Sequence, residues 1–131
     1  MTSSLIDFIE TEYDAAIFIY CLTALADNYI RKEEIQEIHN EMDLLGLESF
    51  SDFQGYKISN WVLFINNLQK ISGTISFKDI EANLESLAKK ISSSSVRKTV
   101  LSAVLRIAYA DDDFHSNEQY VVKELSKIWD L

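Results

Sequence analysis

Proline is absent from this 131-residue chain, and glycine occurs only three times, at Gly46, Gly55 and Gly73. Few residues would therefore break a helix. The same scarcity excludes a glycine-rich loop that holds phosphate, and neither a P-loop nor a nucleophile-elbow motif is present. The single cysteine, Cys21, excludes an intramolecular disulfide and lies in an apolar run, where a small core side chain is expected.

Long hydrophobic runs are also missing. The longest nearly uncharged stretch, residues 15–26, is shorter than the roughly 18 residues that indicate a membrane-spanning helix. We expect a buried helix there and no direct insertion into a membrane. The first 14 residues carry acids where a secretory signal carries positive charge, which predicts an uncleaved, cytoplasmic protein.

Positive charge is scarce, because 12 Lys and Arg stand against 21 Asp and Glu, for a net charge of −9. Nucleic acids and anionic membranes are recognised by clustered Lys and Arg, so no nucleic-acid partner is expected. Cations or basic protein partners fit this charge better. A chain of this length buries about two thirds of its unfolded surface, so one domain over residues 1–131 needs no metal or disulfide to fold.

Apolar residues recur at helical spacing along almost the whole chain, which predicts an all-α fold of about six helices. Residues 48–59 are expected to be irregular, with room for one short turn of helix. The helices are expected over residues 3–26, 32–45, 60–71, 76–91, 96–110 and 116–131, with Gly46 ending the second, Asn60 capping the third, and Ser116 and Gln119 at capping-box spacing in the last.

One pattern occurs twice: a buried helix, a short acidic turn and an amphipathic helix. The first copy reads ALADNYIRKEE at residues 24–34, and the second reads AYADDDFHSNE at residues 108–118. The repeat units extend over about residues 16–47 and 100–131. Two copies of a helical hairpin commonly pack about a pseudo-twofold axis, so we expect two related helix-turn-helix units packed in that way.

The repeated motif, A-x-A-D-G-x-[IL]-x-x-x-E, resembles that of the TerB-like proteins, the tellurite-resistance B group of bacterial stress proteins. The second copy matches it more closely than the first, in which Tyr29 stands where an acid is often found. Both copies depart from the motif at its glycine, which is Asn28 in one and Asp112 in the other. Asn and Asp tolerate a left-handed backbone, so the turn can be kept. The resemblance covers about half of the chain, and residues 48–95 show no recognisable part of it.

The resemblance implies a compact, all-helical and non-enzymatic domain whose acidic turns hold a divalent metal. It also implies a role in resistance to tellurite or related chemical stress. The implied setting is a cytoplasmic complex with a protein partner near a membrane.

Carboxylates in and just after the two turns are the candidate metal ligands. Ca²⁺, Mg²⁺ and Mn²⁺ prefer such hard oxygen ligands. The same pattern also arises without metal, because an Asp in a turn caps the next helix and a Glu in its first turn interacts favourably with the helix dipole. The sequence leaves both interpretations open. The candidates are Asp27 and Asp111 as main ligands, Glu34 and Glu118 completing each site, and Asp113 assisting.

Other metal and catalytic signatures fail on spacing. An EF-hand that starts at Asp111 needs a glutamate at position 122, which is Val122, and a central glycine. Neither His39 nor His115 belongs to an HExxH or Glu-x-x-His motif. No pair of groups has the spacing of an acid–base couple, so an enzyme is not expected.

A second hypothesis, of a different class, is a metal-free acidic interaction module that acts as an adaptor or as an inhibitor of a basic protein. Net negative charge speeds the encounter with a basic partner. The working surface would be the outer faces of the amphipathic helices, and examples of its residues are Glu33, Glu37, Glu41 and Asp43.

Aromatic residues fall on apolar helical positions and are expected in the core. Trp129 is one of these aromatic residues, and together with Leu131 it lies at the C-terminal end. If exposed, they would dock on a partner or on a second copy of the chain, which would form a homodimer.

Overall fold

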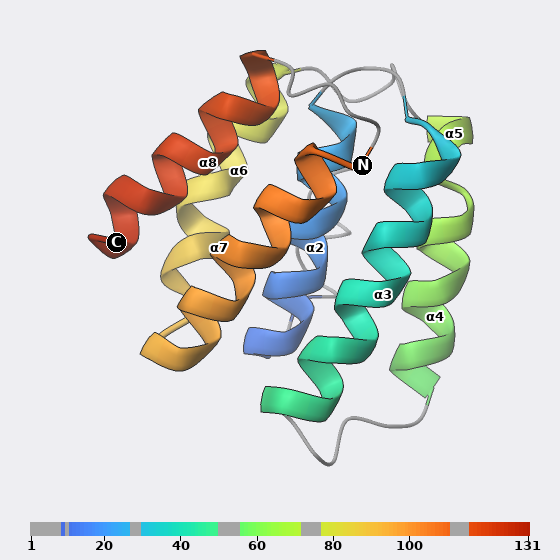
Figure 1. Cartoon of the computed structure of the whole chain (residues 1–131), viewed down its shortest axis with the longest axis horizontal. Helices are drawn as coiled ribbons and strands as arrows, with labels where there is room; N and C mark the ends of the chain where they lie inside the picture. The colour runs from blue at the N-terminus through green and yellow to red at the C-terminus, as the bar shows by residue number, and fades with distance from the viewer. Residues whose placement is uncertain (1–8, 10, 27–29, 50–55, 72–76, 111–115) are drawn as a thin grey trace.

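The computed structural model describes residues 9, 11–26, 30–49, 56–71, 77–110 and 116–131. Within these residues the chain forms seven helices and no strand, which confirms the all-α prediction (Figure 1). The helices are α2 (Glu12–Leu25), α3 (Lys32–Ser49), α4 (Tyr56–Asn66), α5 (Leu68–Ile71), α6 (Phe77–Lys89), α7 (Ser94–Ala108) and α8 (Ser116–Trp129).

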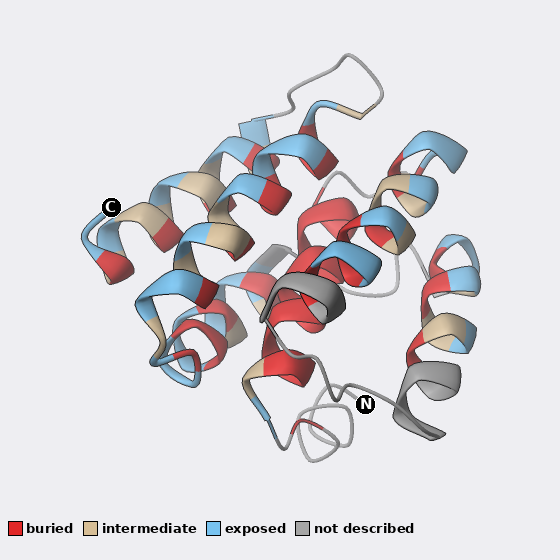
Figure 2. Cartoon of the chain, turned by 60° about the horizontal axis from the view of Figure 1, so that its bottom comes forward, coloured by how far each residue is buried: buried red, intermediate tan, exposed pale blue. Residues whose placement is uncertain are grey.

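Helix α2 lies at the centre of the fold. Every residue from 13 to 25 is buried, and Figure 2 shows this helix buried along its length with the others around it. Helices α3, α6, α7 and α8 all pack against it. A helix that is apolar on every side is stable in water only when other helices surround it. The buried helix predicted over residues 15–26 is thus confirmed.

The two predicted helix-turn-helix units are the pairs α2–α3 and α7–α8. Helix α7 packs against both α2 and α3, while α8 packs against α6 and α7. In Figure 1, α3, α4 and α5 lie on one side of α2, and α6 and α8 lie on the other. The two hairpins therefore share one core, and their pseudo-twofold relation stays a prediction.

The N-terminal ends of α2 and α7 are fastened together by Glu12. Its Oε1 accepts hydrogen bonds from the Ser92 N–H at 2.7 Å, the Ser92 hydroxyl at 2.9 Å and the Ser93 N–H at 3.0 Å. Burial raises the pKa of Glu12, but the hydrogen bonds from Ser93 and Ser92 outweigh it and hold this pKa below its ordinary value. Because α2 and α7 start side by side, their C-terminal ends lie at the same end of the bundle (Figure 1).

Helix α2 begins later than predicted. The start expected at Ser3 or Ser4 lies outside the described residues, but Thr11 has an extended backbone, with φ −130° and ψ 167°, so no helix runs through it. Thr11 Oγ1 accepts the Asp14 N–H, and Asp14 Oδ2 accepts the Thr11 N–H, both at 3.2 Å. This reciprocal capping box fixes the helix start at Glu12.

Replacing Thr11 with alanine should lower the free energy of unfolding by about 0.5–2 kcal/mol, because it removes the acceptor for the Asp14 N–H. Urea denaturation followed by circular dichroism measures the loss. Thr11→Ser keeps the hydroxyl and should retain most of the stability. Equal stability of Thr11→Ala and the unchanged chain would contradict the capping role.

Two boundaries in the middle of the chain are also wrong as predicted. Helix α3 continues through Gly46 to Ser49, because one glycine costs only about 1 kcal/mol in a helix and the adjacent Leu45 is fully buried. Helix α4 begins at Tyr56, so Asn60 lies inside it rather than capping it. Residues 48–49 and 56–59 are helical, so the irregular stretch predicted over residues 48–59 is wrong at both of its ends. The helix predicted over residues 60–71 is divided into α4 and α5.

Candidate metal centre

The residues on either side of the two acidic turns lie at one end of the bundle (Figure 1). Asn117, in the first turn of α8, donates from Nδ2 to the carbonyl oxygen of Ala26 at 2.9 Å. Ala26 is the C-cap of α2, immediately before the first turn. A residue that follows one turn thus contacts the residue that precedes the other. No local sequence signal marks this contact, since the two residues are 91 positions apart.

Three of the five candidate ligands fall outside the described residues. Asp27 lies in the first undescribed turn, and Asp111 and Asp113 lie in the second. The assignment of these three residues as ligands stays a prediction.

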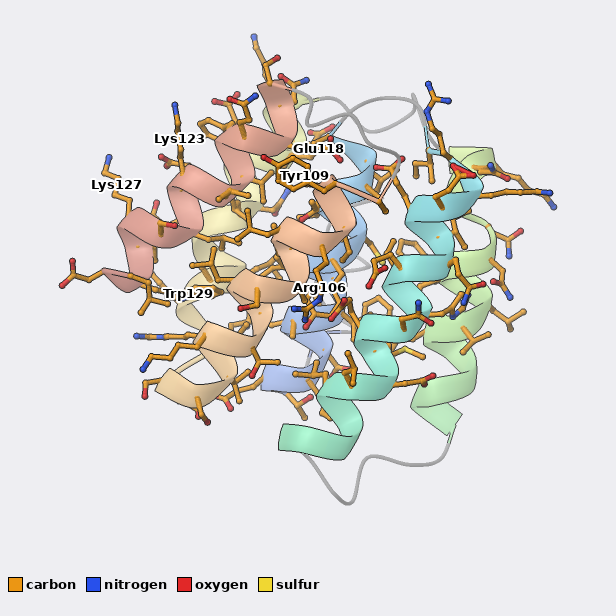
Figure 3. All side chains as sticks on the ribbon, viewed as in Figure 1. Arg106, Tyr109, Glu118, Lys123, Lys127 and Trp129 are labelled. Atoms are coloured by element: carbon orange, nitrogen blue, oxygen red, sulfur yellow. The ribbon has the colours of Figure 1, made fainter. Side chains whose placement is uncertain are left out.

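Glu34 and Glu118 occupy equivalent positions in their helices. Each is the third residue, the N3 position, of α3 or α8, and each has 0% of its surface exposed. Glu118 points inward from the start of α8 (Figure 3). Fully buried glutamates are rare unless they are paired, hydrogen-bonded or bound to a metal.

The capping interpretation is confirmed for Glu34. Its Oε1 accepts the backbone N–H of Arg31, the residue before α3, at 3.0 Å. A carboxylate has two oxygens with about four lone-pair positions, so a capping bond does not prevent the same side chain from binding a cation. Capping and ligation are therefore compatible roles for this residue.

The start of α8 differs from the prediction in register. Because α8 begins at Ser116 itself, Ser116 is the first helical residue and the N3 position belongs to Glu118. The predicted capping box of Ser116 and Gln119 is wrong for this reason. With α8 starting at Ser116, Glu118 has the same position in its helix as Glu34 has in α3.

Asp14 is a third buried acid at N3, which the sequence reasoning missed. It has 0% exposure, and its Oδ1 accepts from Trp61 Nε1 at 2.9 Å. The spacing of Thr11 and Asp14 is the signal that finds it. Asp14 lies at the start of α2, away from the acidic turns, and so provides an internal comparison for Glu34 and Glu118.

Residues 65–131 match the family model described as tellurite resistance protein TerB, which is half of the chain. The chain belongs to the TerB family. The match includes the second copy of the repeat and reaches upstream into residues 65–95, where the motif alone showed no resemblance. The first copy lies outside the matched residues. No curated protein and no solved structure matches the chain.

One acid expected on the outer surface of an interaction module, Glu41, is buried in this TerB-family chain. Glu41 is 2% exposed, and its Oε2 and Oε1 accept from Nε and Nη2 of Arg106 at 2.6 and 2.7 Å. Arg106 lies where α7 borders α3, and α7 covers this side of α3 (Figure 3). Glu33 and Asp43 are exposed and Glu37 is half-buried. The interaction-module hypothesis as a whole stays a prediction.

Trp129 lies in the core, as expected for the aromatic residues, so the condition for docking through this residue is not met. Trp129 is 5% exposed, and its Nε1 donates to the carbonyl oxygen of Ala88 in α6 at 2.9 Å. Its spacing from Val121 and Leu125, which are fully buried, continues the apolar face of α8 into the core. Leu131 is 49% exposed.

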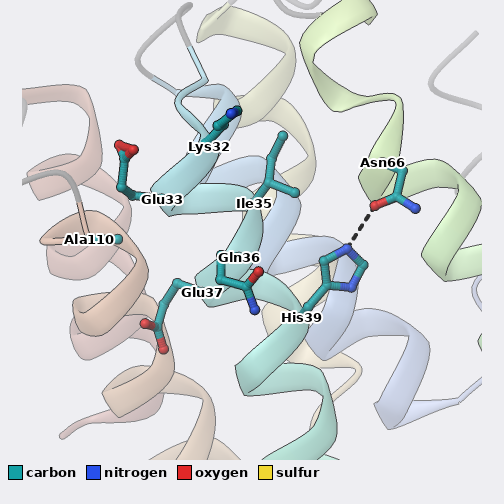
Figure 4. A pocket seen from close by; sticks show the side chains of 8 residues that line it. All are labelled: Lys32, Glu33, Ile35, Gln36, Glu37, His39, Asn66 and Ala110. Atoms are coloured by element: carbon teal, nitrogen blue, oxygen red, sulfur yellow. Dashed lines mark hydrogen bonds between the residues drawn. The ribbon is translucent and has the colours of Figure 1, made fainter.

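A hollow of about 590 Å³ lies along α3 (Figure 4). His39 Nε2 and Asn66 Oδ1 are hydrogen-bonded across it at 2.8 Å. The described residues contain no group of three or more His, Cys, Asp or Glu placed to hold a metal, in this hollow or elsewhere. The hollow is lined by Lys32, Glu33, Ile35, Gln36, Glu37, His39, Asn66 and Ala110.

Cys21 is fully buried in α2, and burial raises the pKa of its thiol. The burial confirms that Cys21 is a core residue, and a buried thiol with a raised pKa is unreactive. Among the described helices, none has the length and apolar character needed to cross a membrane.

Proposed function

We propose that this TerB-family domain binds a divalent cation, Ca²⁺, Mg²⁺ or Mn²⁺, at the end of the bundle where α2 and α7 end and α3 and α8 begin. The main support is the burial of Glu34 and Glu118 at the same N3 position of both hairpins. The Asn117–Ala26 hydrogen bond supports it further, because it joins the flanks of the two turns. Asp27 and Asp111 are the proposed main ligands, with Asp113 assisting.

The donor set suits a hard cation. Buried carboxylates lose hydration, and a bound divalent ion offsets that loss while carboxylate oxygens replace the water molecules of the ion. The two glutamates start at rigid helix ends, so they hold their oxygens in place before the cation arrives. Such a domain acts by binding and not by catalysis.

The proposed setting follows from the family. We propose a role in resistance to tellurite or related chemical stress, in the cytoplasm, together with a protein partner associated with a membrane. A metal-free interaction module is the weaker candidate, because Glu41 lies under α7 and is unavailable to a partner.

A thermal melt of chelator-stripped protein tests the cation site. Ca²⁺, Mg²⁺ or Mn²⁺ at 100 times its dissociation constant should stabilise the fold by about 2.7 kcal/mol. This corresponds to a rise on the order of 10 °C in Tm for a domain of this size. Glu34→Gln and Glu118→Gln should each remove most of the rise.

Asp14→Asn is the matched control, because it changes a third buried N3 acid at the other end of α2. It should lower Tm in the absence of cation but leave the rise with cation unchanged. The proposal fails if none of the three cations raises Tm, or if both glutamine variants keep the full rise.

A further inference from the structure

The contact between α3 and α7 places two acidic side chains beside one arginine. Glu41 of α3 is bound through both oxygens to the Arg106 guanidinium of α7, at 2.6 and 2.7 Å. Glu37 lies one turn earlier on the same side of α3, where it lines a hollow together with Ala110, just after α7, and its carboxyl interacts with Glu41 and Arg106. The contact joins the two hairpins, since α3 belongs to the first and α7 to the second.

Any hydrogen bond between these two carboxyls requires a proton. Ionised carboxylates only accept hydrogen bonds, so two of them cannot bond to each other directly. Glu41 is the ionised member, because it is buried and both its oxygens face the guanidinium. A proton held at this contact therefore belongs to Glu37, which is half-buried.

We propose that Glu37, Glu41 and Arg106 form a proton-dependent clamp between the two hairpins, closed when Glu37 holds a proton and weakened when that proton leaves. In the closed state the charges of Glu41 and Arg106 cancel and Glu37 is neutral. After proton loss, two adjacent carboxylates share one guanidinium, and like charges one helical turn apart repel.

The surroundings of Glu37 favour this behaviour. On α3 itself, Glu33 lies one turn before Glu37, and both line the hollow of Figure 4 together with Lys32. On α7, Arg106 interacts electrostatically with Glu37. On α2, the buried Tyr20 interacts electrostatically with Arg106. On α4, the side chains described from residue 61 to residue 66 carry no charge.

On α3 and α2, Asp43 and Tyr13 also interact with each other, and Asp43 raises the pKa of Tyr13 further above its ordinary value after burial has raised it. No described cation other than Arg106 lowers the pKa of Glu37. Among the described residues, a single positive group therefore counteracts the rise in the pKa of Glu37.

The protonation state changes in the neutral range. The Glu41 hydrogen bond, burial and the Glu41 charge raise the pKa of Glu37 to about 7, against the opposing charge of Arg106. Because this pKa is higher in the folded than in the unfolded chain, the clamp stabilises fully below the ordinary glutamate pKa. The contribution is lost as the pH rises through about 7.

Carboxyl NMR of ¹³C-glutamate-labelled protein, recorded from about pH 5 to about pH 8.5, tests the clamp. One glutamate signal should titrate near pH 7, and the Arg106 Nε–H signal should shift with the same midpoint. Amide exchange in α3 and α7, corrected for the intrinsic rate, should rise several-fold over this range.

Glu37→Gln should abolish the neutral titration, the Arg106 shift and the pH-dependent part of the exchange. Glu33→Gln, which changes an exposed acid on the same helix, should keep all three. If Glu37→Gln does not fold, the unchanged chain alone still tests the clamp, through the neutral glutamate titration and the Arg106 Nε–H shift with the same midpoint. The clamp is wrong if every glutamate titrates below about pH 6, or if the neutral transition survives in Glu37→Gln.

Discussion

Replacing Trp129 with alanine is expected to lower the free energy of unfolding by about 3–5 kcal/mol. The indole is 5% exposed and packs where α8 meets α6. Its removal leaves a cavity and deprives the Ala88 carbonyl oxygen of the donor that lies at 2.9 Å. Urea denaturation followed by far-ultraviolet circular dichroism gives the loss directly.

Leu131→Ala is the matched control for this truncation, because Leu131 is 49% exposed and lies two residues further along the chain. Its change should stay within about 0.5 kcal/mol. Trp129→Phe fills most of the space without the N–H donor and should lose less than the alanine variant. If Trp129→Ala were as stable as the unchanged chain, the C-terminal end of α8 would be a surface for docking and not part of the core.

Trp129 illustrates how far the sequence pattern can be trusted. The spacing of Val121, Leu125 and Trp129 already predicts a common apolar face on α8, and the structure buries all three. The alternative of an exposed tryptophan rested only on its nearness to the end of the chain. Helical periodicity is a physical signal for burial, whereas position in the sequence is not.

Helix α3 shows what local reasoning omits. Glu33, Glu37 and Glu41 recur at four-residue spacing and therefore share one side of the helix. Their environments differ, because α7 covers Glu41 while Glu33 stays exposed. The residue that pairs with Glu41 is Arg106, 65 positions away, and nothing in the local pattern marks it.

The candidate metal centre was predictable in part. The repeat gives Glu34 and Glu118 the same register, and the structure places both at N3. Their complete burial was not predictable, since charge and helix position both favour an exposed side chain. The contact of Asn117 with Ala26 depends on how the two hairpins pack, and this packing is a property of the whole core.

Replacing Arg106 with methionine is expected to cost about 3 kcal/mol, whereas Glu41→Gln should cost clearly less. Breaking a buried ion pair is costly mainly because one charge is left without its partner. The Glu41 side chain is 1% exposed and the Arg106 side chain is 49% exposed. Loss of Arg106 strands a buried carboxylate, while loss of the Glu41 charge leaves a guanidinium that water can solvate. Methionine keeps the apolar stem, so the difference reports the charge.

The exposed pair of Glu85 and Lys89 is the control for this asymmetry. Its side chains are 66% and 68% exposed and 3.0 Å apart, so Lys89→Ala should change the free energy of unfolding by no more than about 0.5 kcal/mol. Urea denaturation at neutral pH measures all three variants. Equal costs for Arg106→Met and Glu41→Gln would mean that the carboxylate relaxes into water when its partner is lost. The asymmetric result instead assigns most of the cost to desolvation of Glu41, which makes Arg106 the residue that permits an ionised acid to lie between the two hairpins.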